Sequence, residues 1–378
     1  MDTIIKNLSE AVSLIASENT WIEGTAIQQL HHVATLSGVT KVVGMPDLHP
    51  GRGYPVGASC FSIGRFYPAL VGNDIGCGMS LWQTDITTNK LHMDKLEKRI
   101  GSIDLPLDQN WHTEIAELGL SDVPFRHALG TIGRGNHFAE LQQLDQVLDA
   151  VSLQTLGIER RQLLLLVHSG SRGLGESVLR AHTEQFGHAG LEQGSAPAEQ
   201  YLAQHQQALH YAVGNRQLIA RRLLNKLRAE GECLLDVNHN LVSAATIDGQ
   251  QGWLHRKGAT PTDQGIVVIP GSRGDYSYLV APIADSRSLF SIAHGAGRKW
   301  MRSECKDRLN QRFGVEQLRR TSFGSRVICD DKALLFEEAP QAYKPIDSIV
   351  EVLQQAGLIR VLARLKPVLT YKTREECC

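Results

Sequence analysis

A carboxylate and a thiol lie three residues apart in the segment Asp74-Ile75-Gly76-Cys77-Gly78-Met79, and glycines flank the thiol. Glycine leaves the backbone free to turn both side chains toward one point. A thiolate beside a carboxylate is a ligand pair suited to a soft or borderline divalent metal ion. The alternative interpretation is a buried free cysteine that only packs in the core.

Three histidines strengthen the metal interpretation, because His137, His168 and His239 each lie in a segment rich in glycine, serine or asparagine. Each histidine alone is more often a satisfied polar residue than a ligand. Together with Asp74 and Cys77 they suit one or two divalent ions, since five ligands exceed the four of a closed structural zinc site. The Cys77 thiolate could bridge two ions. Mn²⁺, Zn²⁺, Fe²⁺ and Co²⁺ all suit this set, and affinity order alone does not choose among them.

Two loops contain further polar residues that could take part in binding or catalysis. Asp47 and His49 lie in the turn-rich loop 46–53, which indicates either an active-site loop or an aspartate that satisfies its own turn. The segment that begins at His168 contains Ser171 and Arg172 among glycines. A strand that ends in such a loop suits phosphate binding. It is not a P-loop, because the lysine and its spacing are missing.

Short apolar runs precede most of these residues and predict buried strands at residues 41–45, 68–71, 79–83, 162–167, 233–237 and 265–269. Helical spacing predicts helices at residues 3–17, 25–34, 89–100, 141–151 and 198–230, a helix from about residue 346, and a basic helix starting at Arg298. We therefore expect an α+β fold with a mixed β core, a central metal cleft where the loops converge, and helices outside. Helices do not alternate regularly with strands, so a parallel doubly wound sheet is not expected.

The predicted helix 198–230 carries a basic face, which indicates either a solvated surface or a surface that contacts RNA. Its cationic residues are Arg216, Arg221, Arg222, Lys226 and Arg228.

The composition is that of an ordinary globular protein, with 378 residues, 42% hydrophobic and 21% charged. The net charge of −1 excludes a wholly basic nucleic-acid binder but not a local basic cleft. Seven scattered cysteines indicate a reducing compartment. No apolar run approaches the roughly 18 residues of a membrane span, so we expect a cytoplasmic protein without membrane association. The motifs extend from Asp47 to Lys372 and predict one domain, 1–378, with 372–378 as a mobile tail that ends in Cys377 and Cys378.

Six motifs occur in one order along nearly the whole chain: Asp-x-Gly-Cys-Gly-Met, Gly-Asn-His-Phe-x-Glu, His-Ser-Gly-Ser-Arg-Gly, His-Asn, Pro-Gly-Ser and His-Gly-Ala-Gly-Arg. In this order they resemble the RtcB family of RNA ligases. The resemblance implies a GTP-dependent, Mn²⁺-using enzyme. Such an enzyme joins RNA that ends in a 2′,3′-cyclic phosphate or a 3′-phosphate to RNA with a 5′-hydroxyl end.

The resemblance also implies roles for individual residues. The matching metal ligands, for two Mn²⁺ ions, are Asp74, Cys77, His137, His168 and His239, and His294 matches the histidine that becomes guanylylated. The positions implied to bind the guanylate are Asn136, His137, Phe138, Ala139, Glu140, His239, Asn240, Pro270, Gly271, Ser272, Arg273, Ser277, His294, Gly295, Ala296, Gly297, Tyr343 and Lys372. RNA phosphates would meet Arg172, Arg273, Arg298 and Lys299.

Some residues depart from the family pattern. Arg273 follows Pro-Gly-Ser where the family commonly has methionine, the stretch from Lys299 to Arg302 is altered, and six residues follow Lys372. These departures resemble a side branch that is coupled to a release-factor-H-like partner and is thought to mend cleaved ribosomal RNA. They imply a peptide-release-factor-like partner or an archease-like activator.

Two other classes of function stay open. A metal-dependent phosphoesterase acting on RNA ends could use the same five ligands without His294. A non-catalytic protein that binds RNA ends or ribosomes would be expected to have lost ligands, and all five are present.

Overall fold

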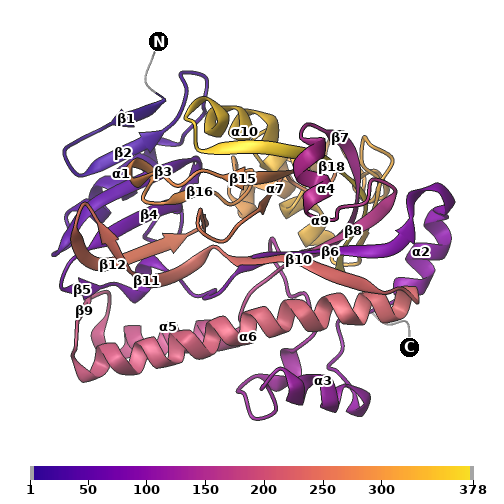
Figure 1. Ribbon diagram of the computed structural model, residues 1–378, viewed down its shortest axis with the longest axis horizontal. Helices are drawn as coiled ribbons and strands as arrows, with labels where there is room; N and C mark the ends of the chain where they lie inside the picture. Colours follow the sequence, from indigo (N-terminus) through magenta and orange to yellow (C-terminus); the bar gives the residue numbers. More distant parts are fainter. Residues whose placement is uncertain (1–3, 375–378) are drawn as a thin grey trace.

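Two large β-sheets form the body of the protein (Figure 1), and the computed structural model describes residues 4–374. The first sheet has the order β1-β2-β3-β4-β12-β11 and is antiparallel except for the β2–β3 pair. Its strands are β1 (Ile5–Asn7), β2 (Val12–Ile15), β3 (Val39–His49), β4 (Val56–Ser62), β12 (Gln250–Lys257) and β11 (Asn240–Ile247).

The second sheet has the order β10-β6-β8-β7-β18-β15-β14, with β17 added in parallel to β18. Its strands are β10 (Gly231–Asn238), β6 (Gly78–Thr87), β8 (Gln162–Ser169), β7 (Phe138–Val147), β18 (Ile359–Thr373), β15 (Ser277–Pro282), β14 (Val267–Pro270) and β17 (Arg326–Cys329). Two short pairs complete the strands: β5 (Arg65–Phe66) with β9 (Leu191–Glu192), and β13 (Ala259–Pro261) with β16 (Ser291–Ala293). The expected mixed β core is confirmed.

The two sheets meet where β10 passes into β11, and His239 is the single residue between these strands. In the second sheet Met79 pairs with His168, and Phe138 pairs with His168 from the other side. This register brings the starts of β6 and β7 and the end of β8 to one place beside His239. The predicted convergence of these loops on one site therefore follows from strand pairing.

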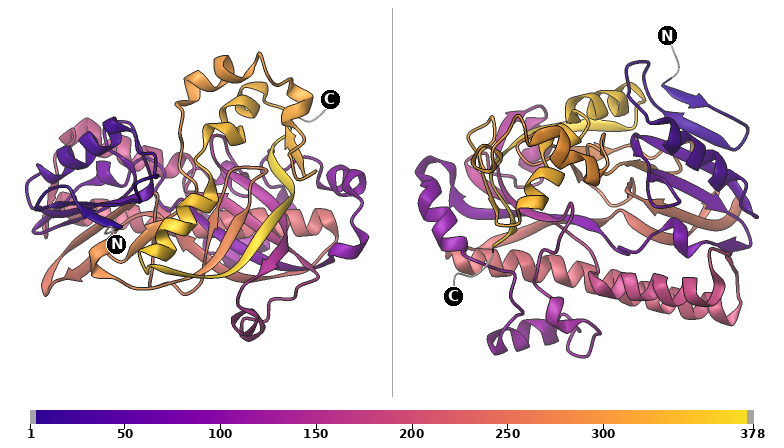
Figure 2. Two further views of the ribbon diagram at one scale, coloured as in Figure 1. Left: turned by 90° about the horizontal axis from the view of Figure 1, so that it is seen from above. Right: turned by 180° about the vertical axis from the view of Figure 1, so that it is seen from behind.

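Helices lie outside the sheets, and α6 runs along the face formed by β6, β8 and β10 (Figures 1 and 2). The α-helices are α1 (Gly24–Ala34), α2 (Met93–Ile100), α3 (His112–Glu117), α4 (Ala150–Thr155), α5 (Gly173–Phe186), α6 (Ala196–Leu227), α7 (Arg302–Leu309), α8 (Val315–Leu318), α9 (Lys332–Glu337) and α10 (Ile346–Gln355). Within residues 4–374, no helix is long and apolar enough to cross a membrane.

Three predicted elements are wrong. Residues 3–17 were expected to be helical, but they contain β1 and β2, because β2 alternates toward the core and pairs with β3. Residues 68–71 form the 3₁₀ helix η1 (Pro68–Leu70), in which proline takes the first position. Residues 141–151 mostly belong to β7, which pairs with β8 and β18. In the first and third cases strand pairing overrides the local pattern, and in the second case the proline favours a helical start.

Other boundaries also differ from the predictions. The helix expected to start at Arg298 begins at Arg302, because Arg298 forms a β-bridge with Tyr343. The loop expected at 46–53 starts later, since β3 continues to His49. Strand β18 includes Lys372 and ends at Thr373, and residues 375–378, with Cys377 and Cys378, lie outside the described residues.

Arg216 of α6 is fully buried, which corrects its assignment to a solvated or RNA-contacting face. Its guanidinium donates to both carboxylate oxygens of Asp236 and to the carbonyl oxygens of Gly76 and Ser169, at 2.8 and 2.9 Å. Gly76 precedes Cys77, and Ser169 follows His168. Arg216 therefore anchors the backbone of two candidate ligands.

Replacing Arg216 by methionine is expected to lower the free energy of unfolding by about 3–5 kcal/mol, because the mostly buried Asp236 would lose its partner. The matched control is Arg180→Met on α5, whose pair with Glu184 leaves the two side chains 67% and 72% exposed. The control should change stability by no more than about 0.5 kcal/mol. Denaturant unfolding measures both, and equal small changes would contradict a structural role for Arg216.

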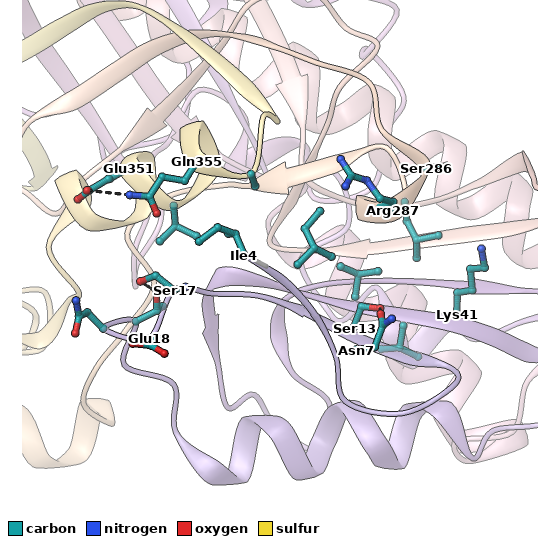
Figure 3. A pocket seen from close by; sticks show the side chains of 18 of the residues that line it. Ile4, Asn7, Ser13, Ser17, Glu18, Lys41, Ser286, Arg287, Glu351 and Gln355 are labelled. Carbon is teal, nitrogen blue, oxygen red and sulfur yellow. Dashed lines mark hydrogen bonds between the residues drawn. The ribbon is translucent and has the colours of Figure 1, made fainter. Parts of the chain in front are cut away.

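A groove of about 1090 Å³ lies between β1, β2 and α10 (Figure 3). Ile4, Ser17 and Glu351 line it, and the Gln355 amide donates to Glu351 at 3.1 Å. None of the predicted site residues lines this groove. The candidate site therefore lies elsewhere, at the meeting of the two sheets.

Candidate active site

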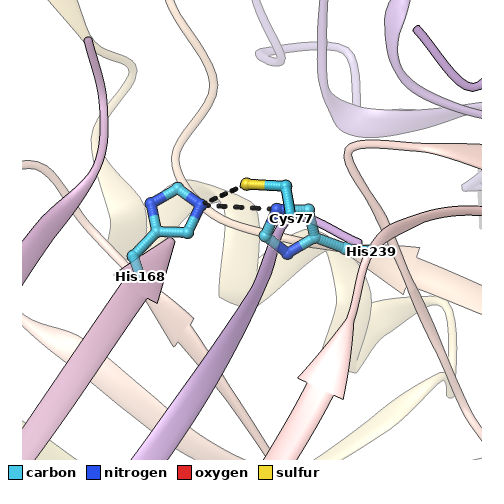
Figure 4. Close-up of side chains that lie close together, drawn as sticks. All are labelled: Cys77, His168 and His239. Atoms are coloured by element: carbon cyan, nitrogen blue, oxygen red, sulfur yellow. Dashed lines mark hydrogen bonds between the residues drawn. The ribbon is translucent and has the colours of Figure 1, made fainter. Parts of the chain in front are cut away.

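Five predicted ligands come together in a buried cluster, part of which Figure 4 shows. The Cys77 thiol sulfur lies 3.1 Å from Nε2 of His168 and 3.4 Å from Nε2 of His137. Nε2 of His168 lies 3.4 Å from Nε2 of His239, and Oδ2 of Asp74 lies 2.8 Å from Nε2 of His137. Two groups of three result, and Cys77 belongs to both.

The donor atoms of this cluster cannot all be satisfied by hydrogen bonds to one another, but they could all coordinate a cation. Nε2 of His168 faces both a sulfur and a second imidazole nitrogen, and one ring nitrogen cannot satisfy both as a donor. Burial holds the pKa values of His168 and His239 well below the usual range, so both rings are neutral and offer lone pairs. The residues present therefore fit one or two divalent ions.

The thiol and the carboxyl group of the cluster respond differently to burial. Burial, and then the Asp74 charge, raise the pKa of the Cys77 thiol well above its usual value. Burial also acts to raise the pKa of Asp74, but the charge and hydrogen bond of His137 outweigh it, and the net pKa is lowered. A bound cation reverses this effect on a thiol, because coordination stabilises the thiolate.

Backbone contacts hold the ligand side chains in place. Nδ1 of His168 lies 3.2 Å from the carbonyl oxygen of Asn136. Donation of an Nδ1 proton to this carbonyl leaves the lone pair on Nε2, facing the cluster. The Asn240 amide donates to the carbonyl oxygen of Asp74 at 3.1 Å, and the N–H of Gly258 donates to Asn240 Oδ1 at 2.7 Å. These bonds fix the Asp74 turn against β11.

His294 lies beside the cluster, with its ring centroid 4.8 Å from that of His239. Its Nδ1 lies 2.7 Å from Oδ2 of Asp47, which is fully buried and whose Oδ1 has no partner among the described residues. The sequence left the role of Asp47 open, and the structure places this carboxylate as the partner of His294. Glycine at position 297 lets the His294 loop pack against the backbone of Asp47, because a Cβ there would lie 2.2 Å from the Asp47 carbonyl oxygen.

The backbone on both sides of Asp47 is also fixed. The Lys344 amine donates to the carbonyl oxygens of Pro46 and Leu48, at 3.1 and 2.7 Å. Nδ1 of His49 lies 2.9 Å from the Asp47 carbonyl oxygen, and burial lowers the pKa of His49 to about 3. His49 is therefore a neutral residue that supports the loop.

Several positions implied to bind the guanylate form a buried polar network. The Gln142 amide donates to Glu140 at 2.7 Å and to the Ser277 hydroxyl at 2.8 Å, and Thr370 donates to Glu140. Burial raises the pKa of Glu140 to about 7. The Lys372 amine donates to the Gly135 carbonyl at 2.7 Å, and burial lowers its pKa to about 8.

Glu338 is the main residue that sequence reasoning missed. Its buried carboxylate lies 3.1 Å from Arg298 and 3.7 Å from Lys372, and it accepts a hydrogen bond from Tyr343. Burial acts against ionisation, but these cations outweigh it and hold the pKa of Glu338 at about 2. The only signal in the sequence was an acidic pair before a proline, which does not distinguish a buried ion pair from a solvated turn.

The arginines expected at RNA phosphates have different surroundings. Arg273 is buried, donates to the Leu335 carbonyl at 2.6 Å, and leaves Nη1 without a partner among the described residues. The Arg172 guanidinium lies against Gly133, where a Cβ would come within 1.8 Å of it. Arg298 contacts Glu338 and Tyr343. Arg273 and Arg298 are thus engaged within the protein.

The fold is mixed α+β, with an Asp/Cys/His cluster where its two sheets meet. These features are those of a protein with a site for divalent metal ions. The chain belongs to the RtcB family, because the family model described as tRNA-splicing ligase RtcB matches residues 29–123 and 121–373. It is 58% identical to the RNA-splicing ligase RtcB2 of Escherichia coli over 98% of both chains. It is 31% identical to the tRNA-splicing ligase RtcB of Nanoarchaeum equitans, over 93% of this chain and 92% of the relative.

A more distant relative is the RNA-splicing ligase RtcB of Mycobacterium tuberculosis, 28% identical over 90% of this chain and 99% of the relative. Family membership and the names of these relatives support RNA ligase function, with RNA as the substrate class. The resemblance seen in six sequence motifs is thereby confirmed.

Proposed function

We propose that this protein is a GTP-dependent RNA ligase that joins 2′,3′-cyclic phosphate or 3′-phosphate RNA ends to 5′-hydroxyl ends. The observation that carries the proposal is the position of His294. Its ring lies 4.8 Å from that of His239 in the ligand cluster, and its Nδ1 lies 2.7 Å from the buried Asp47 carboxylate. An oriented imidazole beside a site for cations suits nucleophilic attack on a nucleotide phosphate.

In the proposed mechanism the Asp47 carboxylate accepts a hydrogen bond from Nδ1–H of His294, and this tautomer leaves the lone pair on Nε2. Nε2 attacks the α-phosphorus of GTP, an N–P bond forms, and pyrophosphate leaves with the electron pair of the broken P–O bond. An oxygen of the RNA 3′-phosphate then attacks the guanylyl phosphorus, a P–O bond forms, and the N–P bond breaks with its electron pair returning to Nε2 of His294. The 5′-hydroxyl attacks the RNA 3′-phosphate, and GMP leaves. A cyclic phosphate end is first opened by water to the 3′-phosphate.

The proposed metal ligands for two Mn²⁺ ions are Asp74, Cys77, His137, His168 and His239. When bound, the ions would neutralise phosphate charge and stabilise the charge that develops during transfer. The support is the convergence of the donor atoms, which lie within 4.8 Å of one another in each group of three. The protein contributes the geometry, through strand register and the contacts of Arg216 and Asn240.

The proposed guanylate site comprises Asn136, His137, Phe138, Ala139, Glu140, His239, Asn240, Pro270, Gly271, Ser272, Arg273, Ser277, His294, Gly295, Ala296, Gly297, Tyr343 and Lys372. It gains support from the N–H of Ala296, which donates to the Pro270 carbonyl at 3.1 Å and joins the His294 loop to β14. The network around Glu140 and the Lys372–Glu338 pair supplies acceptors and a cation nearby.

We further propose that the enzyme repairs RNA in the cytoplasm and prefers nicked structured RNA, such as cleaved ribosomal RNA. A peptide-release-factor-like protein or an archease-like activator is the proposed partner. The motivation is Arg273 and the altered stretch from Lys299 to Arg302. Competition between nicked ribosomal RNA and tRNA halves at fixed salt tests the preference, because phosphate contacts make affinities salt-dependent.

An end-joining assay separates the ligase from a phosphoesterase or a binding protein. RNA with a 3′-phosphate and RNA with a 5′-hydroxyl are incubated with the protein and Mn²⁺, with and without GTP. A ligase gives joined product only with GTP. Release of inorganic phosphate without joining would favour the phosphoesterase, and binding with neither product would favour the non-catalytic protein.

Replacing Asp47 by asparagine is expected to slow guanylylation of His294 by on the order of 10²- to 10⁴-fold, because an amide can present its N–H groups and favour the wrong histidine tautomer. Metal content should stay unchanged, since Asp47 belongs to neither ligand group. Single-turnover labelling with GTP gives the rate, and metal analysis of the same sample is the control. A wild-type labelling rate would contradict an orienting role for Asp47.

A further inference from the structure

A small hollow of about 380 Å³ opens at residues 299–301, five to seven residues after His294. Two tryptophans and a methionine from distant segments supply its apolar part, and charged side chains complete it. The lining residues are Trp21, Glu23, Lys299, Trp300, Met301, Glu304 and Arg308.

Two of the three apolar side chains here are exposed, while Trp300 is partly buried against a neighbouring hydrophobic cluster. Trp21 is 47% exposed and Met301 is 62% exposed. Lys344 Nζ lies 5.8 Å from the Trp21 centroid, and two cations, Lys299 Nζ at 5.2 Å and Arg308 Cζ at 5.1 Å, lie over the Trp300 ring. Exposed aromatic rings accompanied by lysine or arginine are the means by which proteins stack the bases of single-stranded nucleic acid.

The hollow is connected to the proposed catalytic residues by short, direct contacts. The N–H groups of Lys299 and Trp300 donate to the carbonyl oxygen of Ala342, at 2.7 and 3.3 Å, next to Tyr343. Lys344, which lies over Trp21, also donates to the carbonyl oxygens on both sides of Asp47. The two tryptophans are therefore held in a fixed position relative to His294.

The charge of the hollow favours a base over a phosphate. Two cationic residues, Lys299 and Arg308, and two carboxylates, Glu23 and Glu304, line the hollow. Glu304 lies 3.5 Å from Arg308 and accepts the N–H of Met301 at 3.3 Å. The cations and carboxylates nearly cancel, so a phosphate gains little here, whereas a neutral planar base gains stacking and apolar contact.

We propose that Trp21, beside Trp300 in this hollow, forms a stacking platform for an unpaired nucleobase close to the RNA end. This inference rests on the proposed ligase function and names a substrate contact for it. The backbone of the RNA strand passes from the platform toward His294, and the stacked base fixes the distance between the platform and the RNA 3′ end at the catalytic site.

Trp21→Ala tests the platform, because Trp21 is half exposed and its truncation leaves the core intact. The probe is a single-stranded oligoribonucleotide with a 3′-phosphate, measured by fluorescence anisotropy at fixed salt with Mn²⁺. A second probe has the same backbone with abasic residues at its last three positions. Trp21→Phe is the matched control, since it keeps an aromatic face. Labelling with GTP is measured in parallel.

Trp21→Ala should bind the first probe about 5- to 100-fold more weakly than wild type, and both proteins should bind the abasic probe equally. Trp21→Phe should stay within about threefold of wild type, and labelling with GTP should be unchanged in both variants. Unchanged affinity for the first probe would overturn the platform and leave the tryptophans to another occupant, such as a protein partner.

An equal loss of affinity for both probes in Trp21→Ala would also overturn the platform, because the lost contact would then not be with a base. A loss of GTP labelling together with RNA binding would overturn it too, because the substitution would then disturb more than base stacking. Failure of the proposed ligase function would look different. Wild-type protein would then take no label from GTP, while the comparison of the two RNA probes would remain measurable.

Discussion

If the proposed two-ion site is correct, Cys77→Ser is expected to remove both proposed metal ions and abolish joining of RNA ends. The thiol belongs to both groups of three ligands, with its sulfur 3.1 Å from His168 and 3.4 Å from His137. A serine hydroxyl is not deprotonated at neutral pH and is a far poorer ligand. Loss of a residue that only supports a metal ligand weakens metal affinity by about 10- to 100-fold. Loss of a direct ligand should therefore weaken it by at least about 100-fold.

Cys60→Ser is the matched control for this experiment. Cys60 and Cys77 are 4% and 3% exposed, and Cys60 lies in β4 outside both ligand groups. The same chemical change there should cost about 1–2 kcal/mol of stability, through burial of a hydroxyl, and leave metal content unchanged. Metal analysis and end-joining rates are measured on both variants. Full metal content and full joining in Cys77→Ser would restore the interpretation of Cys77 as a packing residue.

His294→Ala is the second change with a large expected effect. In the proposed mechanism the imidazole is the nucleophile for GTP, so the variant should form neither covalent guanylate nor joined RNA from GTP. The variant should fold and keep its metal ions, because the five proposed ligands do not include His294. It should still join RNA whose 3′-phosphate already carries guanylate, since that step needs geometry and cations but no histidine nucleophile.

Two of the candidate ligands, His168 and His239, lie at the ends of strands with a clear pattern, whereas His137 precedes β7, part of which was expected to be helical. The apolar run before His168 and the run before His239 both form the expected strands, β8 and β10. Strand register then places the side chains together. Where the local pattern was ambiguous, as at residues 3–17 and 141–151, pairing with other strands decided the structure, and the predictions were wrong.

The supporting residues could not be predicted, because their partners are far away in the chain. Asp47 and His294 are 247 residues apart, and no spacing rule connects them. Arg216 is 140 residues from Gly76, and on a helix rich in arginine and lysine it looked like part of a charged surface. Glu338 acquires its low pKa from Lys372, from Arg298 and Arg302 of one stretch, and from the hydrogen bond of Tyr343, and these groups come from different parts of the chain. Such residues become visible only when the fold is known.

The most direct test of the proposed mechanism follows label from GTP onto the protein. Wild type and His294→Ala are incubated with GTP labelled at the α-phosphate and with Mn²⁺, and both are run on a denaturing gel. The mechanism predicts retained label on wild type and none on the variant, while the variant still joins pre-activated RNA. Label retained by His294→Ala at the wild-type level would place the nucleophile elsewhere and contradict the mechanism.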